Sequence, residues 1–206
     1  MDPNHYVRGR YEGYLTVPGV RPRSATEAFA ALRLEIDNWR WAGVPFYIRA
    51  GKLLARHVTE IRVIFKRPPR LAFAPRFAPG PDELVLRIDP DPGINLMVQA
   101  KQPGAQTTRA VDLSLIFAEE LGEAPQPYER LLGDALKGDS SLFTREDSVE
   151  ETWRIVQPLL DAPPPVPPAW SISGLARRRS VTRMRGAPRR VLGVQLRDVL
   201  RHRQGR

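Results

Sequence analysis

A single cation offers the clearest chemistry in this sequence. Lys52 closes the stretch Ile-Arg-Ala-Gly-Lys, at the end of the short apolar segment 45–49. A compact ammonium group beside glycine leaves room for an anionic ligand. A solvated turn lysine is the alternative, and the residues alone favour it. The GxxxxGK[ST] spacing is missing, so the lysine does not belong to a phosphate-binding P-loop.

Composition narrows the class of protein. The 206 residues include no cysteine, which excludes disulfides and thiolate metal sites, and we expect no metal. No apolar run approaches the roughly 18 residues of a membrane span, and the N-terminus lacks a secretory apolar segment. These features predict a cytoplasmic protein without a membrane partner.

The net charge of +9 is confined to one end of the chain. Up to about residue 160, lysines and arginines equal the acidic residues in number. Residues 161–206 contain many arginines, and their acidic residues are Asp161 and Asp198 alone. This distribution indicates a neutral domain with an arginine-rich tail. We place the domain at residues 1–162 and expect a proline- and arginine-rich, disordered tail at 163–206.

Hydrophobic periodicity predicts the elements that position Lys52. Period-two alternation or short apolar runs predict strands, and residues at helical spacing predict two later helices. The expected strands are 30–37, 45–49, 60–66, 83–88, 94–101 and 110–117, and the helices are 127–137 and a segment after Thr144. Strands followed by helices favour an α+β fold, with a largely antiparallel or mixed sheet and helices on one face.

Finer features also carry expectations. Residues 1–25 read as irregular, and the proline-rich segment 162–168 should end regular structure. Gly138 should cap the first helix, while Thr144 and Asp147 suggest a capping box for the second. We expect the large aromatic residues to be core, namely Trp39, Trp41, Tyr128 and Trp153.

Several blocks together resemble one enzyme family. They are VRGRYEGY, ALRLEIDNWRWAGVPFYIRAGK, TEIRVIFK, ELVLRI, PYERLLGDALKGDSSLFTR and WRIVQPLL. In order and spacing they are similar to the C-terminal domain of glucose-6-phosphate dehydrogenases, over about three quarters of the chain. The resemblance implies the oxidation of glucose 6-phosphate with NADP, in the pentose phosphate pathway, and a sheet used for oligomer contacts.

The resemblance also implies binding residues. Lys52 matches a lysine that contacts the sugar phosphate. His57 falls where the family usually has a basic residue near the phosphate, and Asp89 where many members have a glutamine near the sugar. Both departures weaken the expected site, because neutral imidazole binds phosphate less well than arginine and a carboxylate repels it.

A second, structural NADP site is the weaker expectation. Arg49, Arg62 and Arg87 match arginines that hold this NADP in some members. Arg62 and Arg87 also lie in alternating strands, where an exposed arginine is expected, and the C-terminal contributors to the site are missing. We therefore do not expect the site here.

The family's catalytic half is not in the sequence. No glycine-rich strand-to-helix turn for a dinucleotide is present. The histidines His5, His57 and His202 match no catalytic motif of the family, so we expect no catalytic residue here and no activity from this chain alone. The expected partners are glucose 6-phosphate, a second copy, or a complementary chain with the NADP-binding domain.

The tail departs from the family after the prolines. Codons permitted for residues 169–179, read one base later, can give PGASLGLPDAD, which is close to the family's usual continuation. This suggests a frameshifted tail. The alternative is a genuine basic arm on a non-catalytic interaction module that binds nucleic acid, and the accidental tail is the hypothesis we favour.

Overall fold

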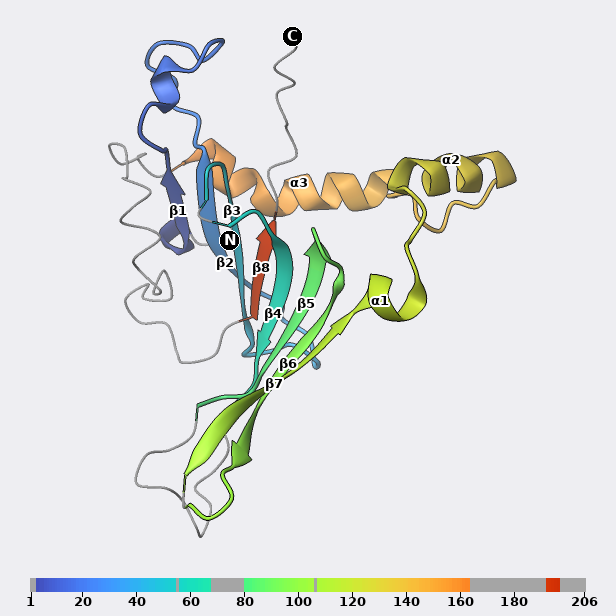
Figure 1. The fold of residues 1–206 in the computed structure, drawn as a ribbon. Coiled ribbons are helices and arrows are strands. Elements are labelled where there is room, and N and C mark those ends of the chain that lie inside the picture. Colours follow the sequence, from blue (N-terminus) through green and yellow to red (C-terminus); the bar gives the residue numbers. More distant parts are fainter. Residues whose placement is uncertain (1–2, 55, 68–79, 106, 164–191, 197–206) are drawn as a thin grey trace.

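The fold is described from a computed structural model. It covers residues 3–54, 56–67, 80–105, 107–163 and 192–196 (Figure 1). The strands are β1 Tyr6–Gly9, β2 Phe29–Glu35, β3 Pro45–Gly51, β4 Thr59–Ile64, β5 Glu83–Asp89, β6 Gly93–Lys101, β7 Thr108–Ile116 and β8 Leu192–Leu196. The α-helices are α1 Phe117–Leu121, α2 Pro127–Lys137 and α3 Glu146–Asp161, and short 3₁₀ turns occupy Pro3–His5 and Tyr14–Thr16.

The strands form one eight-stranded sheet in the order β1-β2-β3-β8-β4-β5-β6-β7. From β1 to β7, strands that are consecutive in the chain pair antiparallel, except that β3 and β4 are separated by β8. β8 lies parallel to β3 and antiparallel to β4. The predicted α+β fold with a largely antiparallel sheet is confirmed.

Most expected elements occur within one or two residues of their predicted bounds, and α2 matches its predicted range. Among the described strands and α-helices, three were not predicted: β1, in the segment expected to be irregular, α1 directly after β7, and β8. The prediction that regular structure ends at residues 162–168 is therefore wrong for residues 192–196. The boundary between domain and tail stays a prediction.

The core of the sheet is centred on Phe29. Phe29 lies opposite Gly9 of β1 and Gly51 of β3. A Cβ on Gly51 would come within 2.8 Å of the Phe29 ring, so glycine makes room for it. Phe29 and Ala31 are the buried residues of β2, whereas Leu32 and Leu34 on its other face are half-buried.

The aromatic residues expected in the core are at the surface. Trp39 is 89% exposed and Tyr128 80%, and Trp41 and Trp153 are also exposed. For the tryptophan pair the reason is local, because the Asn38 side-chain oxygen accepts the backbone N–H groups of Arg40 and Trp41. This turn ends β2 before either tryptophan, so the strand spacing does not extend to them.

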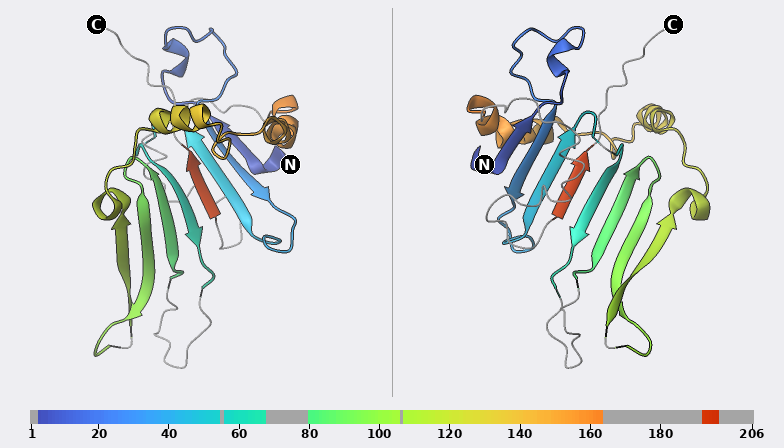
Figure 2. Two further views of the ribbon diagram at one scale, coloured as in Figure 1. Left: turned by 90° about the vertical axis from the view of Figure 1, so that its right-hand side faces the viewer. Right: turned by 60° about the vertical axis from the view of Figure 1, so that its left-hand side comes forward.

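The two long helices lie toward the end of the molecule opposite the tip of the β6–β7 hairpin (Figures 1 and 2). Helix α2 ends at Gly138 in the left-handed conformation, as predicted. The expected capping box at Thr144 is absent: Arg145 precedes the first turn of α3 and pairs with Asp147 through its guanidinium. Leu159 is the one buried residue of α3.

Candidate functional site

The residues expected to bind the sugar phosphate gather at one end of the sheet. β3 ends at Gly51, β4 starts at Thr59, and β5 ends at Asp89. Thr59 pairs with Asp89 across the β4–β5 ladder, so both lie at the same end. β3 and β4 run in opposite directions, because both flank β8 with opposite polarity. Segment 52–58 therefore joins β3 to β4 at the end of the sheet where β5 also ends, and β8 and β4 lie between β3 and β5.

Lys52 is fixed through its backbone and projects into solvent. Its backbone N–H donates to the Ala28 carbonyl at 2.8 Å, which continues the β2–β3 pairing by one step. The next residue, Leu53, has φ 52°, a left-handed conformation that turns the chain sharply. The side chains of Lys52 and His57 are exposed. A rigid strand end thus presents an accessible cation.

Asp89 is the last residue of β5 and lies at the same end of the sheet. Its side chain is half-buried and its partner across the ladder, Thr59, is only 7% exposed. The register shifts between Thr59 and Glu60, and the peptide bond from Asp89 to Pro90 is cis. The shift in register places the carboxylate at an irregular strand end, and one of its two oxygens, Oδ2, is buried there.

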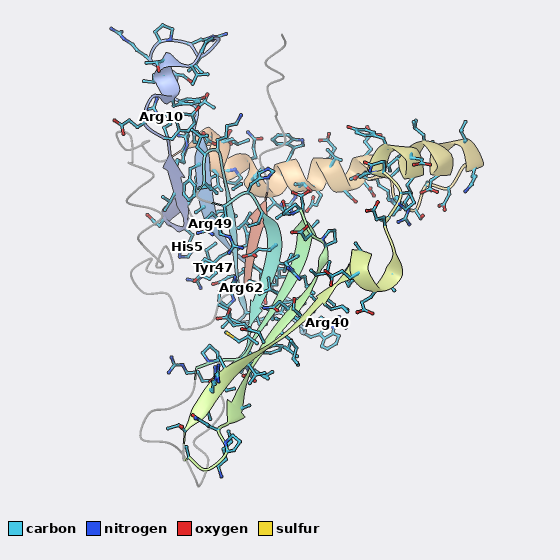
Figure 3. All side chains as sticks on the ribbon, viewed as in Figure 1. His5, Arg10, Arg40, Tyr47, Arg49 and Arg62 are labelled. Atoms are coloured by element: carbon cyan, nitrogen blue, oxygen red, sulfur yellow. The ribbon has the colours of Figure 1, made fainter. Side chains whose placement is uncertain are left out.

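The three arginines of the second expected site lie within the sheet. Figure 3 labels Arg49 on β3 and Arg62 on β4. Arg62 donates to Glu83 at 2.8 Å and to Glu60 at 3.2 Å. Desolvation lowers the pKa of Arg62, but Glu60 and Glu83 outweigh it and raise this pKa overall. Two carboxylates already neutralise Arg62 and would repel a phosphate.

Arg49 and Arg87 have different surroundings. Desolvation and the charge of Arg62 lower the pKa of Arg49, against an opposing effect of Glu60. Arg87 donates to the Ser114 hydroxyl at 3.2 Å and lies 3.5 Å from the Leu115 carbonyl. Gly93 lies close by: a Cβ there would come within 2.3 Å of the Leu115 carbonyl and 3.2 Å of the Arg87 guanidinium. Arg62 and Arg87 thus make contacts within the sheet that do not fit a shared phosphate site.

Sequence reasoning missed a polar cluster beside β1. Arg8, only 9% exposed, donates to Glu27 at 2.6 Å and to the Ala25 carbonyl at 2.8 Å, and the Tyr6 hydroxyl donates to Glu27 at 3.0 Å. Burial, reinforced by Glu27, raises the pKa of Tyr6 to about 12. The four residues of β1 are too few for periodicity to show. The cluster ties the segment before β2 to the edge of the sheet.

Two negative findings apply to the described ranges. No group of three or more histidine, aspartate or glutamate side chains there is placed to hold a metal ion. Within the same ranges, no helix is long and apolar enough to cross a membrane.

Comparison with known proteins identifies the family. The sequence pattern of the family described as "Glucose-6-phosphate dehydrogenase, C-terminal domain" matches residues 2–170. The chain belongs to this family. The resemblance inferred from the sequence is thereby confirmed.

Individual relatives agree. The chain is 56% identical over 164 residues to glucose-6-phosphate 1-dehydrogenase 1 of Mycobacterium tuberculosis, which covers 79% of this chain and 35% of the relative. It is 46% identical over 163 residues to the enzyme of Aggregatibacter actinomycetemcomitans, covering 76% of this chain and 33% of that protein. The chain thus spans about a third of the length of these relatives.

Two solved structures share the fold. One is glucose-6-phosphate 1-dehydrogenase from Mycobacterium avium, with a TM-score of 0.71 and 49% identity, covering 83% of this chain and 36% of that chain. The other is a glucose-6-phosphate dehydrogenase in complex with its substrate glucose 6-phosphate, with a TM-score of 0.69 and 34% identity, covering 83% and 38%.

Proposed function

We propose that this chain is the C-terminal portion of a glucose-6-phosphate 1-dehydrogenase. The whole enzyme would oxidise glucose 6-phosphate to 6-phosphogluconolactone and reduce NADP, at the entry to the pentose phosphate pathway. The observation that carries the proposal is the family match over residues 2–170, together with the gathering of Lys52, His57 and Asp89 at one end of the sheet. A relative of known structure binds glucose 6-phosphate.

Each of these three residues would have a distinct part in binding. Lys52 would pair with the phosphate as an exposed, backbone-anchored cation. His57 would add a second contact, and a bound phosphate would raise the pKa of its imidazole and so favour the charged form. Asp89 would accept hydrogen bonds from sugar hydroxyls.

The catalytic cofactor site would lie outside this chain. β7 passes directly into α1 at Ile116 and Phe117, without the glycine-rich turn that receives a dinucleotide pyrophosphate. We therefore propose that NADP and the catalytic histidine belong to the N-terminal part that relatives possess. The cytoplasmic location expected from the sequence stays a prediction.

The partner we propose is a chain or segment that carries that N-terminal part. The outward residues of α2 and α3 support this, because Tyr128, Leu132, Leu136 and Trp153 are between 55% and 90% exposed. Exposed apolar patches of this kind mark interaction surfaces in soluble proteins. Contact with a second copy through the sheet is the further assembly that the family implies.

A titration of the purified full chain tests the sugar-phosphate site. Glucose 6-phosphate should raise the thermal midpoint of the wild-type chain, and Lys52→Gln should weaken its affinity by at least about tenfold, the cost of roughly 1.4 kcal/mol of lost binding. Lys137→Gln on α2 removes an equal charge away from strands β3–β5 and should change nothing. Equal affinity of both variants for glucose 6-phosphate would show that Lys52 does not contribute to binding.

An activity assay tests whether catalysis requires the N-terminal part of the enzyme. The chain alone should reduce no NADP in the presence of glucose 6-phosphate. Addition of the N-terminal part of the Mycobacterium tuberculosis relative, up to the start of its matched region, should restore reduction. NADPH formed by the purified chain alone would overturn the assignment of catalysis to the other part.

A further inference from the structure

A gap one strand wide separates β3 from β4. These strands are consecutive in the chain, yet neither pairs with the other. Each pairs with β8 instead: Phe46–Ala50 of β3 align in parallel with Leu192–Leu196, and Glu60–Val63 of β4 align antiparallel with Gln195–Leu192. Figure 2 shows β8 in red between the two strands. Without it, the sheet would consist of β1–β3 and β4–β7, each with one open inner edge.

The occupant of this gap is held by main-chain pairing on both sides. An open strand edge presents a row of unpaired N–H and C=O groups that any extended segment can satisfy. β8 lies beyond residues 2–170, so the match to the family pattern does not include its sequence. Pairing through backbone groups explains how such a segment can still complete the sheet.

The width of the gap also determines the distance that a segment of the proposed site has to span. Segment 52–58 connects β3 to β4 and therefore has to cross the width of β8. With β8 in place the two strands lie two inter-strand steps apart, about 10 Å. Direct pairing of β3 with β4 would halve this span, and the seven connecting residues would have to fold into a different loop. The position of Lys52 relative to β4 thus depends on whether the gap is filled.

We infer that the gap between β3 and β4 is a strand-acceptor site and that residues 192–196 of the same chain occupy it as a latch. The latch sets the conformation of segment 52–58. The coupling between β8 and segment 52–58 follows from the connection of β3 to β4. Only its consequence for sugar-phosphate binding by Lys52 rests on the proposed function.

A disulfide cross-link tests the occupant in the intact chain. The sequence has no cysteine, so Ile61→Cys with Val194→Cys creates a single possible pair at aligned positions of β4 and β8. Antiparallel partners lie within the Cα separation that a disulfide requires. Mild oxidation should join the two positions within one chain. Ile61→Cys with Ile172→Cys, outside β8, should not react at a comparable rate.

Either of two results would overturn the latch. Equal cross-linking of the two pairs would mean that residue 194 has no preferred place beside β4. A disulfide that joins two chains would mean that a second copy supplies the strand.

A peptide experiment tests the acceptor site itself. Val194→Pro removes a backbone donor from the centre of β8 and should release it from the sheet. A fluorescent peptide of residues 190–198 should then bind the variant and not the wild-type chain, while Ile172→Pro should behave as wild type. A peptide that carries proline at position 194 should not bind either chain. Equal peptide binding to all three chains, or to none, would overturn the acceptor site.

Hydrogen exchange completes the test and separates this inference from the proposed function. In Val194→Pro, amides of β3, β4 and segment 52–58 should exchange at least about tenfold faster, whereas those of β6 and β7 should not change. The readout needs no glucose 6-phosphate, so a chain that fails to bind the sugar phosphate can still show the latch. Unchanged exchange in segment 52–58 would show that β8 does not determine the conformation of that segment.

Discussion

At the scale of single residues, Gly51 connects the core to the candidate site. It precedes Lys52 and lies under the Phe29 ring, where a Cβ would approach the ring at 2.8 Å and the Ala28 carbonyl at 3.4 Å. Gly51→Ala should therefore displace Phe29 and lower the free energy of unfolding by about 1–3 kcal/mol. Urea unfolding followed by tryptophan fluorescence or circular dichroism would measure the change.

Gly133 provides the control of opposite sign. It lies within α2, and a Cβ there would meet no atom within 4 Å. Gly133→Ala should raise stability by about 0.5–1 kcal/mol, because alanine loses less backbone entropy on helix formation. If both variants changed stability in the same direction, the packing of Phe29 against Gly51 would not be the reason for the first effect.

Tyr6 gives a prediction for alkaline pH. Its pKa is raised to about 12, first by burial and then by Glu27. The unfolded chain loses this proton near pH 10, whereas the folded chain retains it, so the unfolded state binds fewer protons between these values. Tyr6 should thus make the free energy of unfolding fall as pH rises from about 10 to about 12.

Comparison with Tyr6→Phe isolates that contribution from the other tyrosines and lysines. Denaturant unfolding of both chains at pH 8, 10 and 11.5 would show a steeper decline for the wild type. Parallel declines would mean that Tyr6 titrates alike in the folded and unfolded states.

At the scale of elements, α3 has one buried side chain, that of Leu159. Leu159 is 3% exposed, while its neighbour Leu160 is 48% exposed. Leu159→Ala should cost about 2–4 kcal/mol through lost burial and a residual cavity. Leu160→Ala makes the same chemical change on the exposed side and should cost less than about 1 kcal/mol. Similar losses for the two leucines, measured by urea unfolding, would contradict this anchoring of α3.

The elements also show what sequence patterns can and cannot determine. Strands with clear alternation and the helix from Pro127 to Gly138 were predictable, because their periodicity and capping are local. β1 was too short to show a period, and β8 lies in an arginine-rich tail. The buried face of β2 depends on Gly9 and Gly51 of neighbouring strands, which a pattern within one strand does not contain.

The candidate site follows the same division. Lys52 and Asp89 stand at strand ends that the sequence marks with Gly51 and Pro90, so their turns were predictable. Their common location depends on the order of strands, in which β8 separates β3 from β4. The Arg8–Glu27 pair joins residues 19 apart, and no local pattern relates them. The family resemblance matched the arginines to a second NADP site, which we did not expect here. The structure supplies Glu60, Glu83 and Ser114 as partners of Arg62 and Arg87.

At the scale of the whole molecule, the helical surface is the outstanding feature. In the described part of the chain, no side chain is fully buried, and many large apolar residues of α1, α2 and α3 are exposed. An apolar stripe on a helix predicts a covering partner, but not whether that partner belongs to the same chain. The relatives extend well beyond the matched third, which makes their N-terminal part the natural candidate.

The last prediction concerns this assembly. Tyr128→Glu with Leu136→Glu should leave the stability of the isolated chain within about 0.5 kcal/mol, because both residues are at least 80% exposed and next to no packing is lost. The same pair should weaken association with the N-terminal part of a relative by more than about tenfold, since a charge would be buried without a partner. Glu129→Gln with Lys137→Gln changes polar residues of the same helix and serves as the control. Association measured by light scattering that was equal for both double variants would place the interface elsewhere, and the exposed apolar face of α2 would then need another occupant.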